Sequence, residues 1–174
     1  MTQKHDTHIK YRMATIDDAT DIREIAEYYI NRTTASWRYE ALDLSGYEEM
    51  IRKHQKPNRP MWIAEVDGKA VGYSCLSEFR APEGYWPCAE DSVYVHPEYT
   101  RMGIGHRLMK LLIESAREAR LKAIIAAIDG ANLDSIDFHK QFGFYECGRL
   151  NKIAWKQNSF RDLVLMQLDL DEQA

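Results

Sequence analysis

The chain has 174 residues and a mass of 20.3 kDa, a length that is typical of one folded domain. Hydrophobic residues make up 45% and charged residues 29%, proportions that favour a packed core over a disordered or low-complexity polymer. The formal net charge is −4, with 23 Lys and Arg against 27 Asp and Glu, which disfavours a general binder of nucleic acids or anionic membranes. Any site for an anion must therefore be local.

The chain shows no targeting segment and no metal motif. Its longest apolar runs, such as residues 123–128, are far shorter than the roughly 20 residues that cross a bilayer. The first residues lack the apolar stretch and cleavage site of a secretory signal, so we expect a cytoplasmic protein. Cys75, Cys88 and Cys147 form no CxxC pair, which favours free thiols over disulfides or a zinc site. We expect no metal, no membrane and no nucleic-acid partner.

The first half of the chain predicts both helices and strands. Thr15 and Asp18 form a capping-box pattern, and apolar residues at helical spacing follow them. Asp67-Gly68 lies between two apolar runs and predicts a hairpin with a type I′ turn, because both residues tolerate positive φ angles. The expected elements, in chain order, are a strand at 8–13, helices at 15–31 and 47–54, and strands at 61–66 and 70–76.

The second half begins with a central-looking strand, rich in β-branched and aromatic residues. Asn132 fits the N-cap of a later helix and Gly143 fits its C-terminal left-handed position. No repeat, linker or composition break interrupts the chain, so we predict one α+β domain over 1–174 with loose ends at 1–7 and 171–174. The expected elements are a strand at 88–96, a helix at 104–120, a strand at 123–128, a helix at 132–142, and strands at 144–155 and 163–170.

The most informative segment is a strand, a turn with two glycines and the start of an amphipathic helix. Helix N-termini present unpaired N–H groups, and Gly103 and Gly105 let the backbone approach a phosphate, with Arg101 adding positive charge. A Rossmann GxGxxG motif would need glycine where Leu108 lies, and the Gly-Lys-Ser/Thr of a P-loop is absent. The segment therefore predicts either a different anion cradle or an ordinary strand-to-helix connection.

Arg101-Met-Gly-Ile-Gly105, preceded by Val93-Tyr-Val-His-Pro97, resembles the acyl-CoA pyrophosphate loop of the GNAT superfamily of N-acetyltransferases. The first position of the family pattern is Thr100 here, a change that we expect to be tolerated because the loop binds through backbone N–H groups. Further segments resemble the phosphinothricin acetyltransferase branch, which acetylates the α-amine of phosphinothricin and of methionine sulfoximine or sulfone. They are Thr34-Ala-Ser-Trp37, Tyr85, Glu90-Asp-Ser-Val-Tyr-Val95, Asn132-Leu-Asp-Ser135, His139-Lys-Gln-Phe-Gly-Phe144, and Trp155-Lys156 with Asp162.

The resemblance implies an α+β GNAT fold, in which helices flank both faces of a mixed, mostly antiparallel central sheet. In this fold the strand that carries residues 93–95 splays away from its neighbour, which leaves backbone N–H groups free for the co-substrate and for the oxyanion of acyl transfer. Acetyl-CoA is the implied co-substrate and a homodimer the implied assembly. The implied contacts to acetyl-CoA are Val93, Tyr94 and Val95, the loop residues Arg101, Met102, Gly103, Ile104, Gly105 and His106, and Asn132 and Ser135 at the pantetheine arm.

Two residues are candidates for proton transfer. An alkylammonium must lose a proton before it can attack a thioester, and Glu90 is the candidate base, because partial burial would raise its pKa into a useful range. A structural pairing of Glu90 with an arginine is the alternative. By the same resemblance His139 lies where many relatives carry a tyrosine near the departing thiolate, so it is either an acid or a packing residue beside the co-substrate.

The acceptor side is predicted from Trp37, Arg38, Arg80 and Tyr85, which lie at the branch's positions and would supply walls and cations for an amino acid. Pro82 stands where the branch usually has a second arginine, which leaves the preferred amino acid open. We expect acetyl transfer from acetyl-CoA to the α-amine of a small amino acid or analogue by direct attack. The alternatives are another amine (a polyamine, an aminoglycoside or a protein N-terminus) or a non-catalytic acyl-CoA-binding module.

Overall fold

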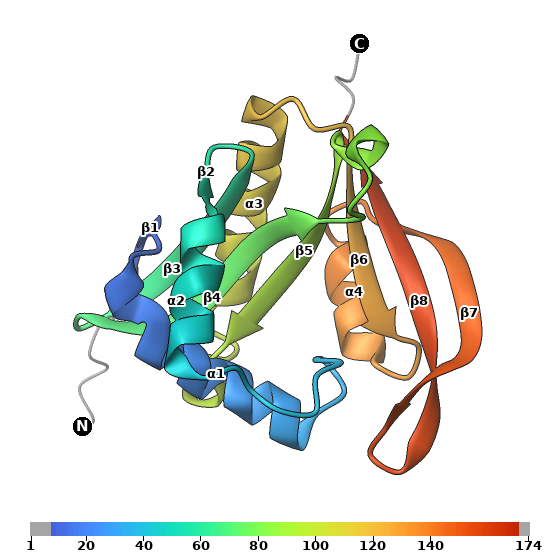
Figure 1. The fold of residues 1–174 in the computed structure, drawn as a ribbon, viewed down its shortest axis with the longest axis horizontal. Helices are drawn as coiled ribbons and strands as arrows, with labels where there is room; N and C mark the ends of the chain where they lie inside the picture. Colours follow the sequence, from blue (N-terminus) through green and yellow to red (C-terminus); the bar gives the residue numbers. More distant parts are fainter. Residues whose placement is uncertain (1–7, 171–174) are drawn as a thin grey trace, which may run out of the picture.

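The computed structural model describes residues 8–170, and the ends predicted to be loose lie outside them, so the prediction of one domain over 1–174 stays a prediction (Figure 1). The strands are β1 Lys10–Met13, β2 Gln55–Lys56, β3 Arg59–Val66, β4 Lys69–Glu78, β5 Cys88–Val95, β6 Ala123–Asp129, β7 Tyr145–Lys156 and β8 Ser159–Asp169. The α-helices are α1 Ala19–Arg32, α2 Leu44–Lys53, α3 Ile104–Glu118 and α4 Leu133–Lys140, and short 3-10 turns span Ile16–Asp18, Glu83–Tyr85 and Pro97–Tyr99.

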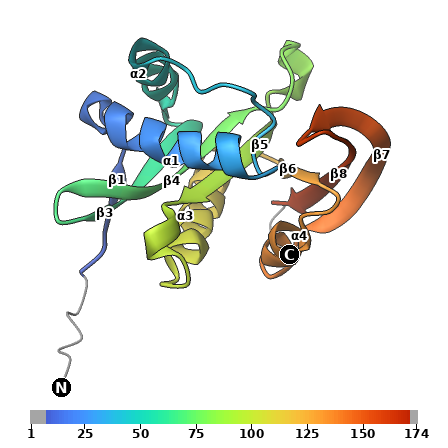
Figure 2. The ribbon, with the colours of Figure 1, turned by 90° about the horizontal axis from the view of Figure 1, so that it is seen from below.

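One mixed sheet has the strand order β1-β3-β4-β5-β6-β8-β7, and β2 pairs with β3 outside this path. All of these pairs are antiparallel except β5 with β6. Figure 2 shows α1 and α2 on one face of the sheet and α3 and α4 on the other. The predicted α+β architecture, with helices on both faces, is confirmed.

Local signals that the sequence carries explain most of the elements. The helical stripe of α1 buries Ile22, Ile25 and Ile30, as its spacing predicts. Asp67 and Gly68 both have positive φ angles, 50° and 80°, which confirms the hairpin turn between β3 and β4.

Some predicted boundaries were wrong. The predicted helix at 47–54 begins earlier, at Leu44, because the Asp43 side chain accepts a hydrogen bond from the Gly46 N–H and caps it. The final strand begins at Ser159 rather than 163, since Gln157 and Asn158 form a tight turn with positive φ angles. The short strand β2 carries no periodic signal and was not predicted.

The predicted splay is present between β5 and β6. These parallel strands pair only from Cys88↔Ala123 to Glu90↔Ile125, and the rest of β5 leaves its neighbour (Figure 1). On its other side β5 stays paired with β4 from Glu78↔Ala89 to Gly72↔Val95. The second half of β5 therefore has one strand partner where a strand inside a sheet has two.

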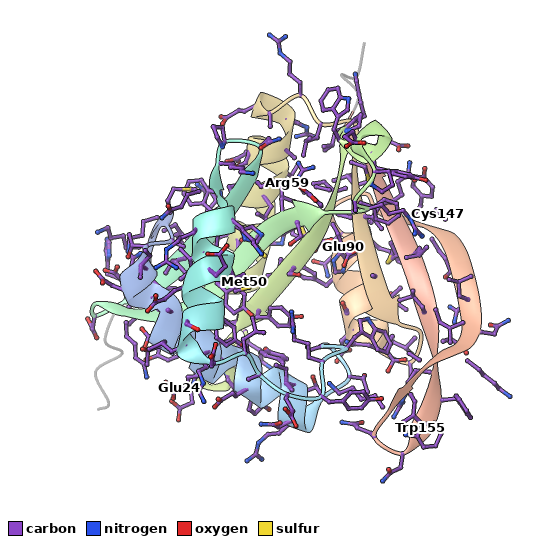
Figure 3. The ribbon with its side chains drawn as sticks, in the orientation of Figure 1. Glu24, Met50, Arg59, Glu90, Cys147 and Trp155 are labelled. Carbon is purple, nitrogen blue, oxygen red and sulfur yellow. The ribbon has the colours of Figure 1, made fainter. Side chains whose placement is uncertain are left out.

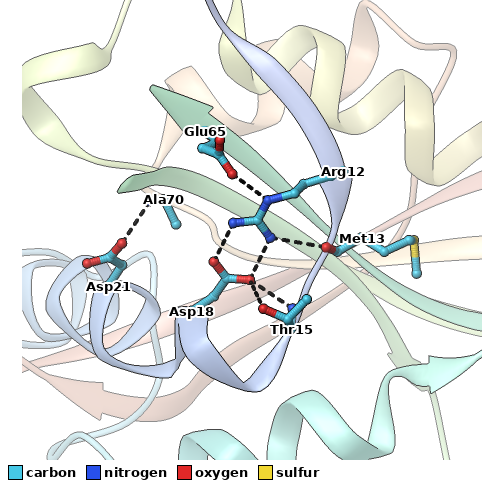
Figure 4. A network of polar contacts seen from close by, with 7 residues as sticks. All are labelled: Arg12, Met13, Thr15, Asp18, Asp21, Glu65 and Ala70. Atoms are coloured by element: carbon cyan, nitrogen blue, oxygen red, sulfur yellow. Dashed lines mark hydrogen bonds and ion pairs between the residues drawn. The ribbon is translucent and has the colours of Figure 1, made fainter. Parts of the chain in front are cut away.

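A polar network fastens the first strand and helix to the sheet (Figure 4). The Arg12 guanidinium donates to both oxygens of Asp18, each at 2.7 Å, and to Glu65 on β3. Burial acts against the charged carboxyl of Asp18, but hydrogen bonds from Arg12 and from the Thr15 backbone N–H outweigh it and lower its pKa. The Asp18 carboxylate therefore fixes the start of the chain and the entry into α1.

We expect Asp18→Asn to destabilise the fold by about 2 kcal/mol at neutral pH, because a charge-assisted pair with Arg12 is lost. A lowered folded pKa means that this stabilisation is present above the unfolded pKa of about 3.9 and is lost as the pH falls through the folded pKa. Urea denaturation should thus show a difference in the free energy of unfolding between wild type and variant, and this difference should become smaller as the pH falls below about 4. The exposed Asp137→Asn is the control, and a difference that is independent of pH would contradict the assignment.

Candidate active site

A cleft of about 720 Å³ opens where β5 leaves β6. Its walls come from the second half of β5, the turn before α3, the C-terminal end of β6, α4 and the segment between α1 and α2. The lining includes Trp37, Glu90, Asp91, Val93, Tyr94, Val95, Arg101, Gly103, Ile104, Gly105, His106, Asn132, Ser135 and His139. Elements from both halves of the chain therefore meet at the splay.

The antiparallel register fixes which amides of β5 face the cleft. The His96 N–H donates to the Val71 carbonyl at 2.8 Å, so this opposing pair is of the hydrogen-bonded kind. Such pairs alternate with pairs whose N–H and C=O groups point away from the partner strand. Tyr94 therefore directs its N–H to β4, whereas Val93 and Val95 direct theirs to the side that β6 has left. Of the three predicted residues, Val93 and Val95 are the ones that offer backbone donors.

The N-terminus of α3 forms the second wall. Arg101 and Gly103 have positive φ angles, 64° and 78°, which turn the chain so that α3 can begin at Ile104. A Cβ on Gly105 would lie 3.7 Å from Val95, so this helix start packs closely against β5. The first amides of the helix, with Arg101 beside them, suit a diphosphate. Met102 alone among the predicted loop residues is absent from the lining and is exposed.

Glu90 lies at the point where β5 and β6 part (Figure 3). Its side chain has no hydrogen bond or ion pair within residues 8–170, so the structure offers no arginine partner for it. Burial, and then the neighbouring Asp91 carboxylate, raise the pKa of Glu90 above its ordinary value. A half-buried carboxylate without a partner is free to accept a proton in the cleft.

His139 lies on α4 and is held from both ring nitrogens. Its Nδ1 is 2.6 Å from the Ser135 carbonyl and its Nε2 is 3.1 Å from the Asp91 carboxylate. Burial alone would lower the pKa of His139, but the hydrogen bond and the charge of Asp91 outweigh it, and the pKa is raised. Sequence analysis missed Asp91, whose only signal was its place directly after Glu90, on the opposite face of the strand.

Asn132 and Ser135 both line the cleft at the start of α4. The Asn132 side chain accepts a hydrogen bond from the Ser135 N–H at 3.2 Å, which confirms that Asn132 caps the helix. Their contact with the pantetheine arm stays a prediction.

The four predicted acceptor residues are not brought together. Trp37 lines the cleft, whereas Arg38, Arg80 and Tyr85 are absent from its lining. The guanidinium of Arg80 lies over the Phe79 ring, 5.3 Å from its centroid, in the connection that leads into the start of β5. Trp37 belongs to the connection between α1 and α2, which lies near the C-terminal end of β5 (Figure 1). The roles of these residues stay predictions.

A buried lysine ties the segment that carries Trp37 to the end of β7. Lys156 is 5% exposed, and its ammonium group donates to the backbone carbonyls of Ser36 and of Arg38, the latter at 2.9 Å. The hydroxyl of Tyr39 donates in turn to the Trp155 carbonyl. Burial lowers the pKa of Lys156. The hairpin of β7 and β8 therefore positions the segment between α1 and α2, through contacts that no local sequence pattern reveals.

Within residues 8–170, no helix is long and apolar enough to span a membrane, and no group of three or more His, Cys, Asp or Glu side chains could hold a metal ion. The cleft instead offers backbone donors, a helix N-terminus and the half-buried, unpaired carboxylate of Glu90. These groups suit a long ligand that combines a diphosphate with an amide-containing arm.

Comparisons with known proteins identify this architecture. The acetyltransferase (GNAT) family matches residues 22–144, and the chain belongs to that family. It is 31% identical to the L-methionine sulfoximine/L-methionine sulfone acetyltransferase of Salmonella typhimurium (94% of this chain, 95% of the relative). It is 30% identical to a phosphinothricin N-acetyltransferase of Alcaligenes faecalis (92% and 82%).

Solved structures agree with the sequence relatives. An acetyltransferase from Salmonella typhimurium, solved with acetyl-CoA, matches with a TM-score of 0.91 and 30% identity, covering 97% of both chains. A ribosomal-protein-alanine N-acetyltransferase from Brucella melitensis matches with a TM-score of 0.89 and 34% identity, covering 92% of this chain and 99% of the other. The protein is thus an acetyltransferase of the GNAT fold, with acetyl-CoA as its co-substrate.

Gly103→Ala should weaken the binding of acetyl-CoA about tenfold, because a left-handed φ costs an L-residue roughly 1–2 kcal/mol and relief of that strain would move the first amides of α3. Gly68→Ala is a matched control, since Gly68 has a φ of 80° and, like Gly103, no atom within 4 Å of an added Cβ. Calorimetry should show equal losses of stability but a change of Kd in Gly103→Ala alone. Equal Kd values for the two variants would contradict a role of this turn in binding.

Lys156→Met should loosen the segment between α1 and α2, because two backbone carbonyls lose a buried donor while the apolar stem is kept. Hydrogen–deuterium exchange at residues 35–39 should become at least about fivefold faster, with little change at the amides of α3. Lys110→Met, at an exposed position of α3, serves as the control. Unchanged exchange at 35–39 would show that the lysine does not hold this segment.

Proposed function

We propose that the protein transfers the acetyl group of acetyl-CoA to the α-amine of a small amino acid or amino-acid analogue, by direct attack of the amine. The observation that carries this proposal is Glu90, a half-buried carboxylate with a raised pKa and no partner within residues 8–170, at the point in the cleft where β5 and β6 part. Such a group can accept a proton from an ammonium ion at neutral pH. The co-substrate supplies an activated acetyl group as a thioester. The amine nitrogen bonds to the acetyl carbon, the C–S bond breaks, and the coenzyme leaves as a thiolate that takes up the second amine proton through solvent.

Each group in the cleft has a separate role in the proposed reaction. Glu90 takes the proton of the acceptor ammonium, directly or through a water molecule, and passes it to solvent. The N–H groups of Val93 and Val95 donate to the oxygen on which negative charge develops. The N-terminus of α3 and Arg101 hold the diphosphate and so fix the distance to Glu90. No covalent bond to the protein is needed.

The acceptor class rests on the curated relatives, whose named substrates are methionine sulfoximine, methionine sulfone and phosphinothricin. These compounds are α-amino acids with a polar side-chain head. Trp37 would provide one wall of their pocket, and Arg38, Arg80 and Tyr85 stay predicted contacts to the carboxylate and head group. Pro82, where the branch usually has a second arginine, leaves the preferred member of the class open.

A protein N-terminus is the second candidate acceptor, because the Brucella melitensis structure is named for the alanine of a ribosomal protein. An extended peptide would need an open path to Glu90 along Trp37. Lys156 and Tyr39 close the neighbouring segment against the β7 and β8 hairpin, which favours the smaller acceptor.

The homodimer and the cytoplasmic location are further parts of this proposal. Large apolar side chains are exposed on the edge strand β7, at Leu150, Ile153 and Trp155, and near the start of β8, at Phe160. An edge of this kind suits a two-fold contact with a second copy of the chain.

Glu90→Gln should lower kcat/KM for the acceptor about 10²–10⁴-fold, because the amide cannot accept the ammonium proton. In the wild type, kcat/KM should rise with pH through the raised pKa of Glu90, and this acidic limb should disappear in the variant. The assay is thiol release with phosphinothricin, methionine sulfone and an alanine-initiated peptide.

Glu118→Gln, an exposed change at the end of α3, is the control and should leave all rates unchanged. A Glu90→Gln variant with wild-type kcat/KM would remove Glu90 as the base. Turnover of the peptide in preference to both amino acids would move the acceptor class to protein N-termini.

A further inference from the structure

The pair formed by Asp91 and His139 has no part in the reaction scheme above, although both side chains are almost wholly buried. The side chain of Asp91 is 3% exposed and that of His139 is 8% exposed. The Ser135 carbonyl and the Asp91 carboxylate are both acceptors, so both ring nitrogens of His139 must carry a proton to satisfy them. The pair is therefore an imidazolium beside a carboxylate.

The position of the pair in the sheet is specific. Asp91 is the first residue of β5 beyond Glu90↔Ile125, the last pair that β5 makes with β6. His139 lies on α4, the helix that follows β6 in the chain. The ion pair thus joins β5 to the β6–α4 unit at the place where the backbone ladder stops. At this position a side-chain contact between β5 and α4 takes the place of backbone pairing between β5 and β6.

The charge of the pair also acts on the neighbouring base. Within residues 8–170, the charge of Glu90 also acts on Cys75 of β4 and on Cys88 and Tyr94 of β5. Burial raises the pKa of Cys75 to about 12 and also raises the pKa values of Cys88 and Tyr94, so these groups are neutral near pH 7. Asp91 is then the charged neighbour of Glu90, and His139 is the cation that balances Asp91.

We propose that Asp91 and His139 are a positioning pair, which pins the diverging end of β5 to α4 and sets the charge around Glu90, and that His139 is not the acid that protonates the departing thiolate. This inference rests on the proposed role of Glu90 as the base. Both N–H groups of His139 are committed, and a proton given away from Nε2 would leave a buried carboxylate without compensation. The bond from His139 goes to Asp91 Oδ2, and the buried Oδ1 has no hydrogen-bond partner within the described residues.

Two substitutions separate charge balance from packing because their expected effects on Glu90 have opposite signs. Asp91→Asn removes the negative neighbour and should lower the pKa of Glu90 by about one unit. His139→Gln removes the cation but keeps an amide donor for Asp91, and should raise the pKa of Glu90 by about one unit. The double variant Asp91→Asn/His139→Gln also lacks the Asp91 charge, so the pKa of Glu90 should be lowered as in Asp91→Asn alone, because His139 without Asp91 is already neutral.

Nuclear magnetic resonance on the full chain without acceptor gives the first readout. The side-chain carboxyl ¹³C signal of Glu90, assigned with Glu90→Gln, is titrated in each variant. The ring ¹⁵N signals of His139 are recorded in the wild type, where both nitrogens should be protonated at neutral pH. A single protonated nitrogen, or shifts of Glu90 in the same direction in both variants, would overturn the proposal. The ring measurement on the wild type tests the protonation of both nitrogens of His139 even if a variant does not fold.

The pH dependence of kcat/KM gives the second readout. Its acidic limb should move to lower pH in Asp91→Asn and to higher pH in His139→Gln, with the KM for acetyl-CoA changed less than threefold. An unmoved acidic limb together with loss of an alkaline limb in His139→Gln would instead identify His139 as the acid. Absence of acetyl transfer to every acceptor would count against the proposed function alone, since the resonance titration needs no acceptor.

Discussion

The separation of β5 from β6 is the constraint on which the rest of the molecule depends. Backbone N–H and C=O groups in the middle of a sheet normally find partners on both sides, and leaving them unpaired is costly. Here the second half of β5 keeps its pairing with β4 and loses β6, so Val93 and Val95 face a cleft instead of a strand. A ligand with amide groups along its length can take the place of the missing strand, and this accounts for a binding site in the middle of a hydrophobic sheet.

Side-chain contacts hold the diverging half of β5 in place where the ladder to β6 has ended. The Tyr29 hydroxyl donates to the Val95 carbonyl at 2.6 Å, and the Tyr94 hydroxyl donates to the Ala35 carbonyl at 3.1 Å. Asp91 and His139 do the same from the opposite face. These contacts hold the free edge in a fixed shape before any ligand arrives, which lowers the entropic cost of binding. The base, the amide donors and the helix N-terminus are thereby placed by rigid elements.

The sequence predicted what local patterns encode. The helical stripe of α1 and the Asp67-Gly68 turn each specify backbone conformation within a few residues, and both were found as expected. The site was harder because its residues meet through tertiary packing. Asp91 and Lys156 carry no periodic or spacing signal: their partners lie 48 to 120 residues away. Arg80 was placed in the acceptor site by resemblance, and its position over Phe79 depends on the path of a long connection that no motif specifies.

The contact between Lys156 and the carbonyls of Ser36 and Arg38 links positions 118 and 120 residues apart in the chain. On a ribosome the N-terminal part of a protein emerges and folds first. The wall beside Trp37 is therefore without its anchor while the segment from α1 through α4 emerges. That wall becomes fixed only when the last hairpin has been synthesised and has closed over it. The same hairpin also completes the core, because Val164, Met166 and Leu168 of β8 are buried in one cluster with side chains of α3, β6 and α4, so the wall and the core should mature together.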